Sequence, residues 1–174
     1  MKINVIGTSG SGKSTFARKL AAKLCHEYIE LDQIFWLPNW TEPRDEDLFA
    51  KLRTALDKPS WVLDGNYSRT NSIKWESVDS VIWLDYSFAR TLSQAVFRAL
   101  RRAWTKEELW PGTGNRESFR GSFLSRKSII LWTIQQHGPT REKNLRIMQD
   151  PKHAHIKFVR LANHREADRY LNSV

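Results

Sequence analysis

The chain has 174 residues, 40% of them hydrophobic and 27% charged, a composition that suits one globular domain with its own core. No apolar run approaches the roughly 18 residues of a membrane span, and the run after Met1 is too short for a secretion signal, so we expect a cytoplasmic protein without membrane contacts. The single cysteine, Cys25, excludes an internal disulfide, and its place in a helical pattern predicts packing in the core.

The net charge of +9 comes from the second half of the chain. Residues 1–85 hold 11 Lys and Arg against 12 Asp and Glu, whereas residues 86–174 hold 17 against 7. Such an excess is typical either of a solvated basic face or of a segment that binds anions, in the form of phosphates or nucleic acid.

The predicted elements alternate between strands and helices. Short apolar runs predict strands at residues 2–6, 28–31, 61–63, 81–84 and 156–161. Amphipathic patterns predict helices at 13–25, 45–57, 87–102, 122–136, 140–149 and from about 165, with 105–121 irregular. This alternation predicts a three-layer α/β fold with helices on both faces of a doubly wound, five-stranded parallel sheet. Ligands of such sheets bind beyond the carboxyl ends of the strands, where Gly7, Asp32, Asp64 and Asp85 lie.

A phosphate-binding loop follows the first predicted strand. Its motif is G-x-x-x-x-G-K-[ST], spelled by Gly7, Thr8, Ser9, Gly10, Ser11, Gly12, Lys13 and Ser14. Glycines let backbone N–H groups turn toward phosphate oxygens, and the helix N-terminus adds partial positive charge. We expect Lys13 to reach the β- and γ-phosphates, Ser14 to bind magnesium, and Thr15 to support the helix start. The alternative is a glycine-rich turn before a helix; strand, loop and helix together favour the phosphate loop, most simply for ATP with Mg²⁺.

Two carboxylates are candidates for the same site. Asp64 ends a strand, and we expect it to anchor magnesium; the alternative is a turn aspartate, because Asp-Gly is a common turn pair. Asp32 follows the second strand and is a candidate to accept a proton from a substrate hydroxyl or to hold magnesium, or equally an Asx-turn or helix cap. We interpret Asp85 as structural, because a helix begins just after it.

The phosphate loop, the segment 64–70 (Asp-Gly-Asn-Tyr-Ser-Arg-Thr) and the arginine-rich helix after the fourth strand resemble adenylate kinase and its relatives, which are P-loop NTPases. The segment 31–40 (Leu-Asp-Gln-Ile-Phe-Trp-Leu-Pro-Asn-Trp) together with 64–67 is similar to the bacterial group labelled topology modulation proteins. The resemblance extends over nearly the whole chain. This chain departs from the adenylate kinase pattern at Tyr67-Ser68, which stand where that family has one proline before the arginine.

The resemblance implies one domain over 1–174, with an acceptor-binding region at about 33–60 and a helical lid insertion at about 103–150. It implies that Arg69 grips an acceptor phosphate, and that Arg98, Arg101 and Arg102 meet the donor at the lid. It also implies that Asn163, His164 and Arg165 flank the adenine. Arg116 and Arg120 are further candidates to close the lid, with Gly112, Gly114 and Gly121 as hinges. Trp36 and Trp40 are candidates to stack on a substrate ring, or to pack in the core.

These observations predict an ATP-dependent kinase that transfers the γ-phosphoryl group to a small nucleotide- or nucleoside-like acceptor. Catalysis of this kind depends on positioning and on cations aimed at the moving charge. Two alternatives stay open: a nucleotide-switched regulator that binds nucleic acid through the basic half, and a plain NTPase.

Overall fold

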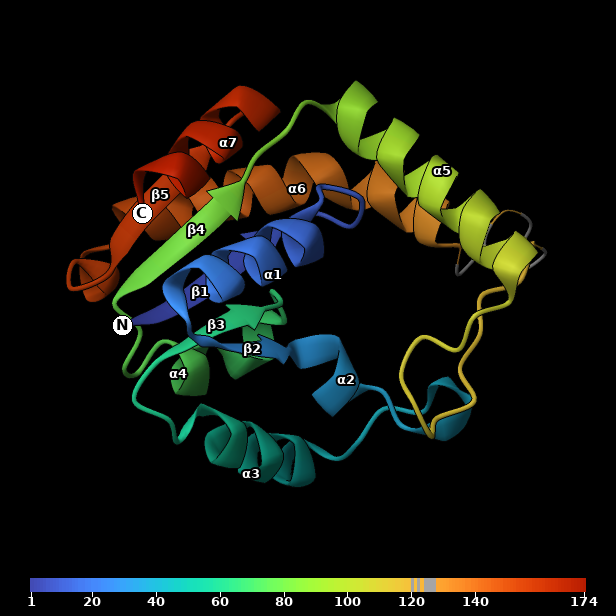
Figure 1. The fold of residues 1–174 in the computed structure, drawn as a ribbon, viewed down its shortest axis with the longest axis horizontal. Coiled ribbons are helices and arrows are strands. Elements are labelled where there is room, and N and C mark those ends of the chain that lie inside the picture. Colours follow the sequence, from blue (N-terminus) through green and yellow to red (C-terminus); the bar gives the residue numbers. More distant parts are fainter. Residues whose placement is uncertain (120, 122, 124–127) are drawn as a thin grey trace.

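The computed structural model describes residues 1–119, 121, 123 and 128–174. Five parallel strands form one sheet in the order β2-β3-β1-β4-β5 (Figure 1). Their bounds are β1 Lys2–Gly7, β2 Glu27–Glu30, β3 Trp61–Asp64, β4 Ser80–Leu84 and β5 Lys157–Leu161. The register places Val5 beside Asp64 and Gly7 beside Leu84, so the strands end at a common edge. The predicted α/β fold with a parallel five-stranded sheet is confirmed.

Helices connect and cover these strands (Figure 1). The α-helices are α1 Lys13–Leu24, α2 Leu31–Phe35, α3 Asp45–Leu56, α4 Asn71–Lys74, α5 Phe88–Thr105, α6 Ile129–Gln149 and α7 His164–Ser173. Short 3-10 helices are η1 Pro38–Trp40, η2 Ser68–Thr70 and η4 Pro151–His153. No helix among the described residues combines the length and the apolar content that a membrane span needs.

The sheet separates two hydrophobic cores. On one face α1 and α7 pack against strand residues such as Val5, Val62 and Ile82. On the other face α3, α4 and the C-terminal half of α6 pack against residues such as Leu63 and Trp83. Burial of both faces explains why the strands are continuous apolar runs rather than alternating patterns.

One buried polar side chain in β1 contacts the chain at the edge of the sheet where the strands end. Asn4 is fully buried, and its Nδ2 donates to the carbonyl oxygens of Leu63 at 3.0 Å and Gly65 at 2.9 Å. Its Oδ1 accepts from Nε1 of Trp75 at 2.9 Å. These bonds satisfy the amide and fix the chain just beyond β3, where Asp64 lies.

Two details differ from the prediction. The helices expected at 122–136 and 140–149 are, from Ile129 onward, the single helix α6, which runs through Pro139; residues 122 and 124–127 of that prediction lie outside the described residues. Contacts on both sides of the proline hold the helix together despite the lost hydrogen bond, with Thr133 buried before it and Asn144 after it. Cys25 is exposed rather than in the core, because it ends α1 in the left-handed conformation (φ 53°).

Candidate phosphate-binding site

The predicted phosphate loop connects β1 to α1 and lies beneath α5. Gly10 and Gly12 have φ of 87° and 83°, which favour glycine. A Cβ on Gly10 would lie 2.5 Å from the carbonyl oxygen of Thr91, so the backbones of the loop and of α5 approach closely. A Cβ on Gly7 would lie 2.5 Å from Oγ of Ser11. The glycines of the motif are therefore needed for packing as well as for backbone conformation.

The N-terminus of α1 has the properties of an anion site. Gly12 stands at the N-cap position and the first turn contains no acidic residue, so its N–H groups are not paired with a capping side chain of any described residue. Lys13 and Ser14 open the helix and are half-buried, whereas Thr15 is exposed. Oγ of Ser11 is buried and has no hydrogen-bond partner in the part of the chain that the structure describes.

Asp64 lies directly across from this helix start. Its Oδ2 accepts a 3.0 Å hydrogen bond from the Tyr28 hydroxyl, while its Oδ1 is buried without a partner among residues 1–119, 121, 123 and 128–174. Burial raises the pKa of the Asp64 carboxyl, Lys13 and Ser14 lower it in part, and Asp32 raises it. The structure thus brings Lys13, Ser14, Asp32 and Asp64 into one electrostatic neighbourhood.

Asp32 occupies the first turn of α2, because β2 ends at Glu30 and the chain turns into a short helix at once. It lies beside the hydroxyl of Tyr67. Burial is the main cause that raises the pKa of Tyr67, and the negative charge of the Asp32 carboxylate is the second. The ring of Tyr67 stacks on Phe35, with 4.1 Å between centroids. Asp32 is half-buried and reachable from solvent, as a proton acceptor must be.

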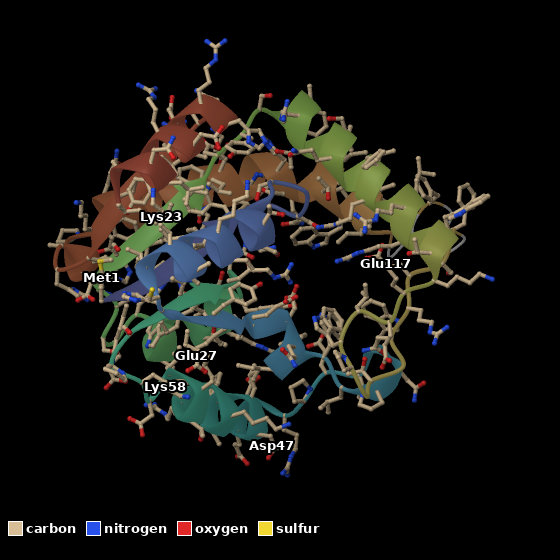
Figure 2. All side chains as sticks on the ribbon, in the orientation of Figure 1. Met1, Lys23, Glu27, Asp47, Lys58 and Glu117 are labelled. Carbon is tan, nitrogen blue, oxygen red and sulfur yellow. The ribbon has the colours of Figure 1, made fainter. Side chains whose placement is uncertain are left out.

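The three predicted lid arginines of α5 differ in their surroundings. Arg98 points at the phosphate loop, where its Nη2 donates to Oγ of Ser9 at 2.6 Å. Arg102 pairs with Glu117 at 2.8 Å, and Figure 2 shows Glu117 beside the C-terminal part of α5. Arg101 is exposed. Burial lowers the pKa of Arg98, as does Arg102, while Glu117, Asp32 and Asp64 raise it.

The remaining arginine candidates lie elsewhere. Arg116 is exposed, and Arg120 lies outside the described residues. Arg141 pairs with Asp85 at 3.1 Å, and Arg160 donates to the same carboxylate from Nε at 2.8 Å. Asp85 is thus enclosed in an ion-pair group at the end of β4, in agreement with a structural role.

Arg69 follows β3 in η2, beside the region of about 33–60 in which we expect an acceptor to bind. Its guanidinium pairs with Glu42 at 3.3 Å and with Asp45 at 3.2 Å. It also lies over the ring of Phe35, 4.8 Å from the centroid. The turn behind it is fixed by the Tyr67 carbonyl, which accepts from Oγ1 of Thr70 at 2.7 Å and from Nζ of Lys74 at 3.3 Å.

The residues expected to flank the adenine begin α7. Oδ1 of Asn163 accepts from the Glu166 N–H at 3.0 Å, and its Nδ2 donates to the Glu166 carboxylate, so its side chain caps the helix. His164 and Arg165 line a cavity of about 540 Å³ with Tyr86 and Arg90, beyond the ends of β4 and β5. Asn163 lines the same cavity while its side chain caps α7, so the structure brings all three predicted residues to one cavity.

Contacts between the loop 106–118 and the segment 36–41 were not predicted. Figure 1 shows the two side by side, the loop in yellow. Asn115 is buried; its Nδ2 donates to the Leu37 carbonyl at 3.0 Å and its Oδ1 accepts from the Trp40 N–H at 2.9 Å. Nε1 of Trp110 donates to Glu30 at 3.2 Å. The only sequence signal was the presence of tryptophans in both segments, which does not reveal their pairing.

Comparisons with known proteins support the fold. No protein-family model matches the sequence. The Bacillus subtilis (strain 168) uncharacterised protein YqaC is 33% identical over 67 residues, which span 36% of this chain and 36% of that protein, so the chain aligns with about a third of this curated relative. A deoxyadenosine kinase from M. mycoides with bound dATP superposes with a TM-score of 0.54 at 16% identity, over 99% of this chain and 98% of that one. An unliganded sugar kinase from Janibacter sp. HTCC2649 gives 0.51 at 16% identity, over 98% and 92%. The chain shares the α/β fold of these two kinases.

Proposed function

We propose that the protein is an ATP-dependent kinase that transfers the γ-phosphoryl group to the hydroxyl of a small molecule. We further propose that it belongs with the bacterial topology modulation proteins, which its sequence resembles. The observation that supports the kinase activity most is the direct bond between Arg98 and Ser9. A phosphate loop alone suits any NTPase, whereas an arginine aimed into it from a second element supplies charge where a phosphoryl group moves.

The residues present fit a nucleoside triphosphate with Mg²⁺. The uncapped start of α1 offers backbone N–H groups to phosphate, with the Ser11 hydroxyl buried beside them. Ser14 and Oδ1 of Asp64 are the proposed protein anchors of the metal, which when bound neutralises phosphate charge. Phosphates and water would supply the other ligands, since no group of three or more His, Cys, Asp or Glu side chains in the described chain could hold a metal by itself.

Each protein group then has a distinct role. Lys13 attracts the β- and γ-phosphates, and Arg98 stabilises charge on the transferred group, with Arg102 as a further cation at the lid. Asp32 accepts the proton of the acceptor hydroxyl as its oxygen attacks phosphorus. Residues of about 33–60, together with Arg69, form the acceptor side; His164 and Arg165 contact the adenine from their cavity.

A Lys13→Ala variant tests the nucleotide site. We expect ATP affinity, measured by titration calorimetry with Mg²⁺, to fall by at least about tenfold, because a charge-assisted contact to phosphate is lost. Lys19→Ala, on the exposed face of the same helix, is the matched control and should bind ATP as the wild type does. Equal affinity in both variants would contradict the proposed site.

A metabolite panel tests the kinase activity. We expect release of ADP that depends on one acceptor class and on Mg²⁺, with product mass increased by one phosphate. Tight ATP binding with only an acceptor-independent rate would show a plain NTPase instead.

A further inference from the structure

The acceptor side of the site contains an arginine that is already neutralised. Arg69 makes two ion pairs, with Glu42 and Asp45, and places its guanidinium over Phe35. These partners lie in the segment after η1 and at the start of α3, so they come from the acceptor region itself. A phosphate on the acceptor would have to displace two carboxylates and then remain beside them, which is unfavourable for like charges.

The other cations around this turn are also engaged. Lys74 is fully buried and donates to the Tyr67 carbonyl. Lys143 donates from Nζ to Oγ of Ser68. Arg44, before α3, pairs with Asp47 at 3.0 Å. Asp32 adds a further negative charge toward the phosphate loop. Among the described residues, the acceptor side therefore lacks the cluster of free arginines that recognition of a phosphate monoester uses.

Aromatic side chains supply the remaining surface. We call Phe35, Trp36, Trp40 and Trp110 the aromatic wall. Neighbouring centroids are 4.8 Å apart for Phe35–Trp36, 5.5 Å for Trp36–Trp40 and 5.8 Å for Trp40–Trp110, all edge to face. Trp40 is 40% exposed although it belongs to this wall, so part of an indole remains available to a ligand. Exposed indole rings stack well on flat aromatic ligands, largely whatever substituents those ligands carry.

We propose that the acceptor is an uncharged, nucleoside-like molecule, with a flat ring held by the aromatic wall and a hydroxyl directed at Asp32, rather than a nucleotide monophosphate or sugar phosphate. This rests on the proposed kinase function. The acceptor oxygen forms a bond to the γ-phosphorus, the bond from that phosphorus to the β–γ bridging oxygen breaks, ADP leaves, and the hydroxyl proton passes to the Asp32 carboxylate. The products are ADP and the phosphorylated acceptor.

Matched acceptor pairs test the proposal. Purified full-length protein is assayed with ATP and Mg²⁺ against deoxyadenosine and dAMP, guanosine and GMP, cytidine and CMP, thymidine and dTMP, and glucose and glucose 6-phosphate. We expect at least one nucleoside to have a kcat/KM about tenfold or more above its monophosphate, because Glu42 and Asp45 repel the latter. In addition, Trp40→Ala should raise KM for that nucleoside about tenfold with a smaller change in kcat, since stacking binds the ground state.

A charge variant isolates the role of the two carboxylates. Glu42→Gln combined with Asp45→Asn frees Arg69. We expect the ratio of kcat/KM for the nucleoside to kcat/KM for its monophosphate to fall by about fivefold or more. The matched control is Glu46→Gln, which removes an exposed carboxylate of the same helix that makes no ion pair with a described residue. The control should keep the wild-type preference.

The outcomes separate the two proposals. Preference for a monophosphate, or for glucose with no effect of Trp40→Ala, would overturn the acceptor inference and leave the kinase function in place. A charge variant that behaves like Glu46→Gln would also overturn it. ATP binding without turnover of any acceptor would contradict the kinase function itself. Circular dichroism and thermal unfolding of each variant establish that it is folded before its kinetics are compared.

Discussion

Nη2 of Arg98 lies 2.6 Å from Oγ of Ser9, so α5 is tied to the phosphate loop by a charged side chain. The same guanidinium is within electrostatic reach of Asp32 and Asp64, which raise its pKa against the effect of burial and of Arg102. Arginine stays protonated in proteins, so Arg98 brings a permanent positive charge to the centre of the site. Its Nε is buried without a partner among the described residues, and a bound phosphate would offer one.

Replacement of Arg98 tests this relationship. We expect Arg98→Met to lower kcat by about 10²–10³-fold with a smaller effect on the KM for ATP, because the charge acts chiefly on the transferred group. Arg101→Met removes an equal charge from the exposed side of the same helix and should change kcat by less than about threefold. Steady-state kinetics of both variants decide the matter, and equal losses would mean that general field effects, rather than the Arg98 contact, assist the reaction.

Gly10 offers a test of the contact between the loop and α5. In Gly10→Ala the new Cβ meets the Thr91 carbonyl at 2.5 Å and the Ala95 Cβ at 2.9 Å, and φ is 87°. We expect a loss of about 2–4 kcal/mol in the free energy of unfolding, together with weaker ATP binding. Gly112→Ala is matched in backbone strain, with φ of 83°, but its Cβ meets no described atom within 4 Å, so only about 1–2 kcal/mol should be lost. Urea unfolding measures both, and equal losses would show that strain alone limits Gly10.

The sheet and the phosphate loop were predictable because both are local in sequence. Apolar runs that stop at Gly7, Asp64 and Asp85 mark strands and their ends, and the spacing of Gly7, Gly12 and Lys13 defines the loop. The bond of Arg98 to Ser9 joins residues 89 positions apart. The hydrophobic periodicity of a sequence does not indicate which distant side chains will form such a bond.

The acceptor side was less predictable for the same reason. The resemblance assigned Arg69 to an acceptor phosphate, yet its local sequence does not show that Glu42 and Asp45 reach it from another turn. The described residues of the region of about 103–150 likewise include the end of α5, a loop held by Asn115, and α6, whose C-terminal half packs on the sheet. In α6 tertiary packing overrides the helix-breaking tendency of Pro139.

Asn115→Ala should release the loop 106–118 from the segment 36–41. The substitution leaves the Leu37 carbonyl and the Trp40 N–H without their partner, at a cost of about 1–3 kcal/mol for each buried group unless water enters. We expect faster hydrogen exchange in both segments, measured by mass spectrometry, and little change in exchange of β1 and β4. Glu107→Ala, an exposed change in the same loop, should leave the exchange pattern as in the wild type. Unchanged exchange at Trp40 in Asn115→Ala would mean that the aromatic contacts alone hold the loop.

Lys74 makes the stability of the protein depend on pH in the alkaline range. Its side chain is 1% exposed, and burial, with a smaller effect of Lys143, lowers the pKa of its ammonium to about 7 from the ordinary 10.5. Between these values the unfolded chain binds a proton that the folded chain does not, so the free energy of unfolding rises with pH. The full slope is about 1.36 kcal/mol per pH unit for one group.

Lys74→Met removes this contribution while keeping a long side chain in the same space. We expect the stability of the wild type, relative to Lys74→Met, to increase by about 2 kcal/mol between pH 7 and pH 9. Urea unfolding at pH 7, 8 and 9 measures the difference, and the lost bond to the Tyr67 carbonyl shifts all three values together. Lys51→Met, an exposed change on α3, should follow the wild type at every pH. If the curves of Lys74→Met and the wild type run parallel, Lys74 stays protonated in the folded protein and its ammonium is stabilised by the Tyr67 carbonyl and by the ring of Trp75, 5.7 Å away.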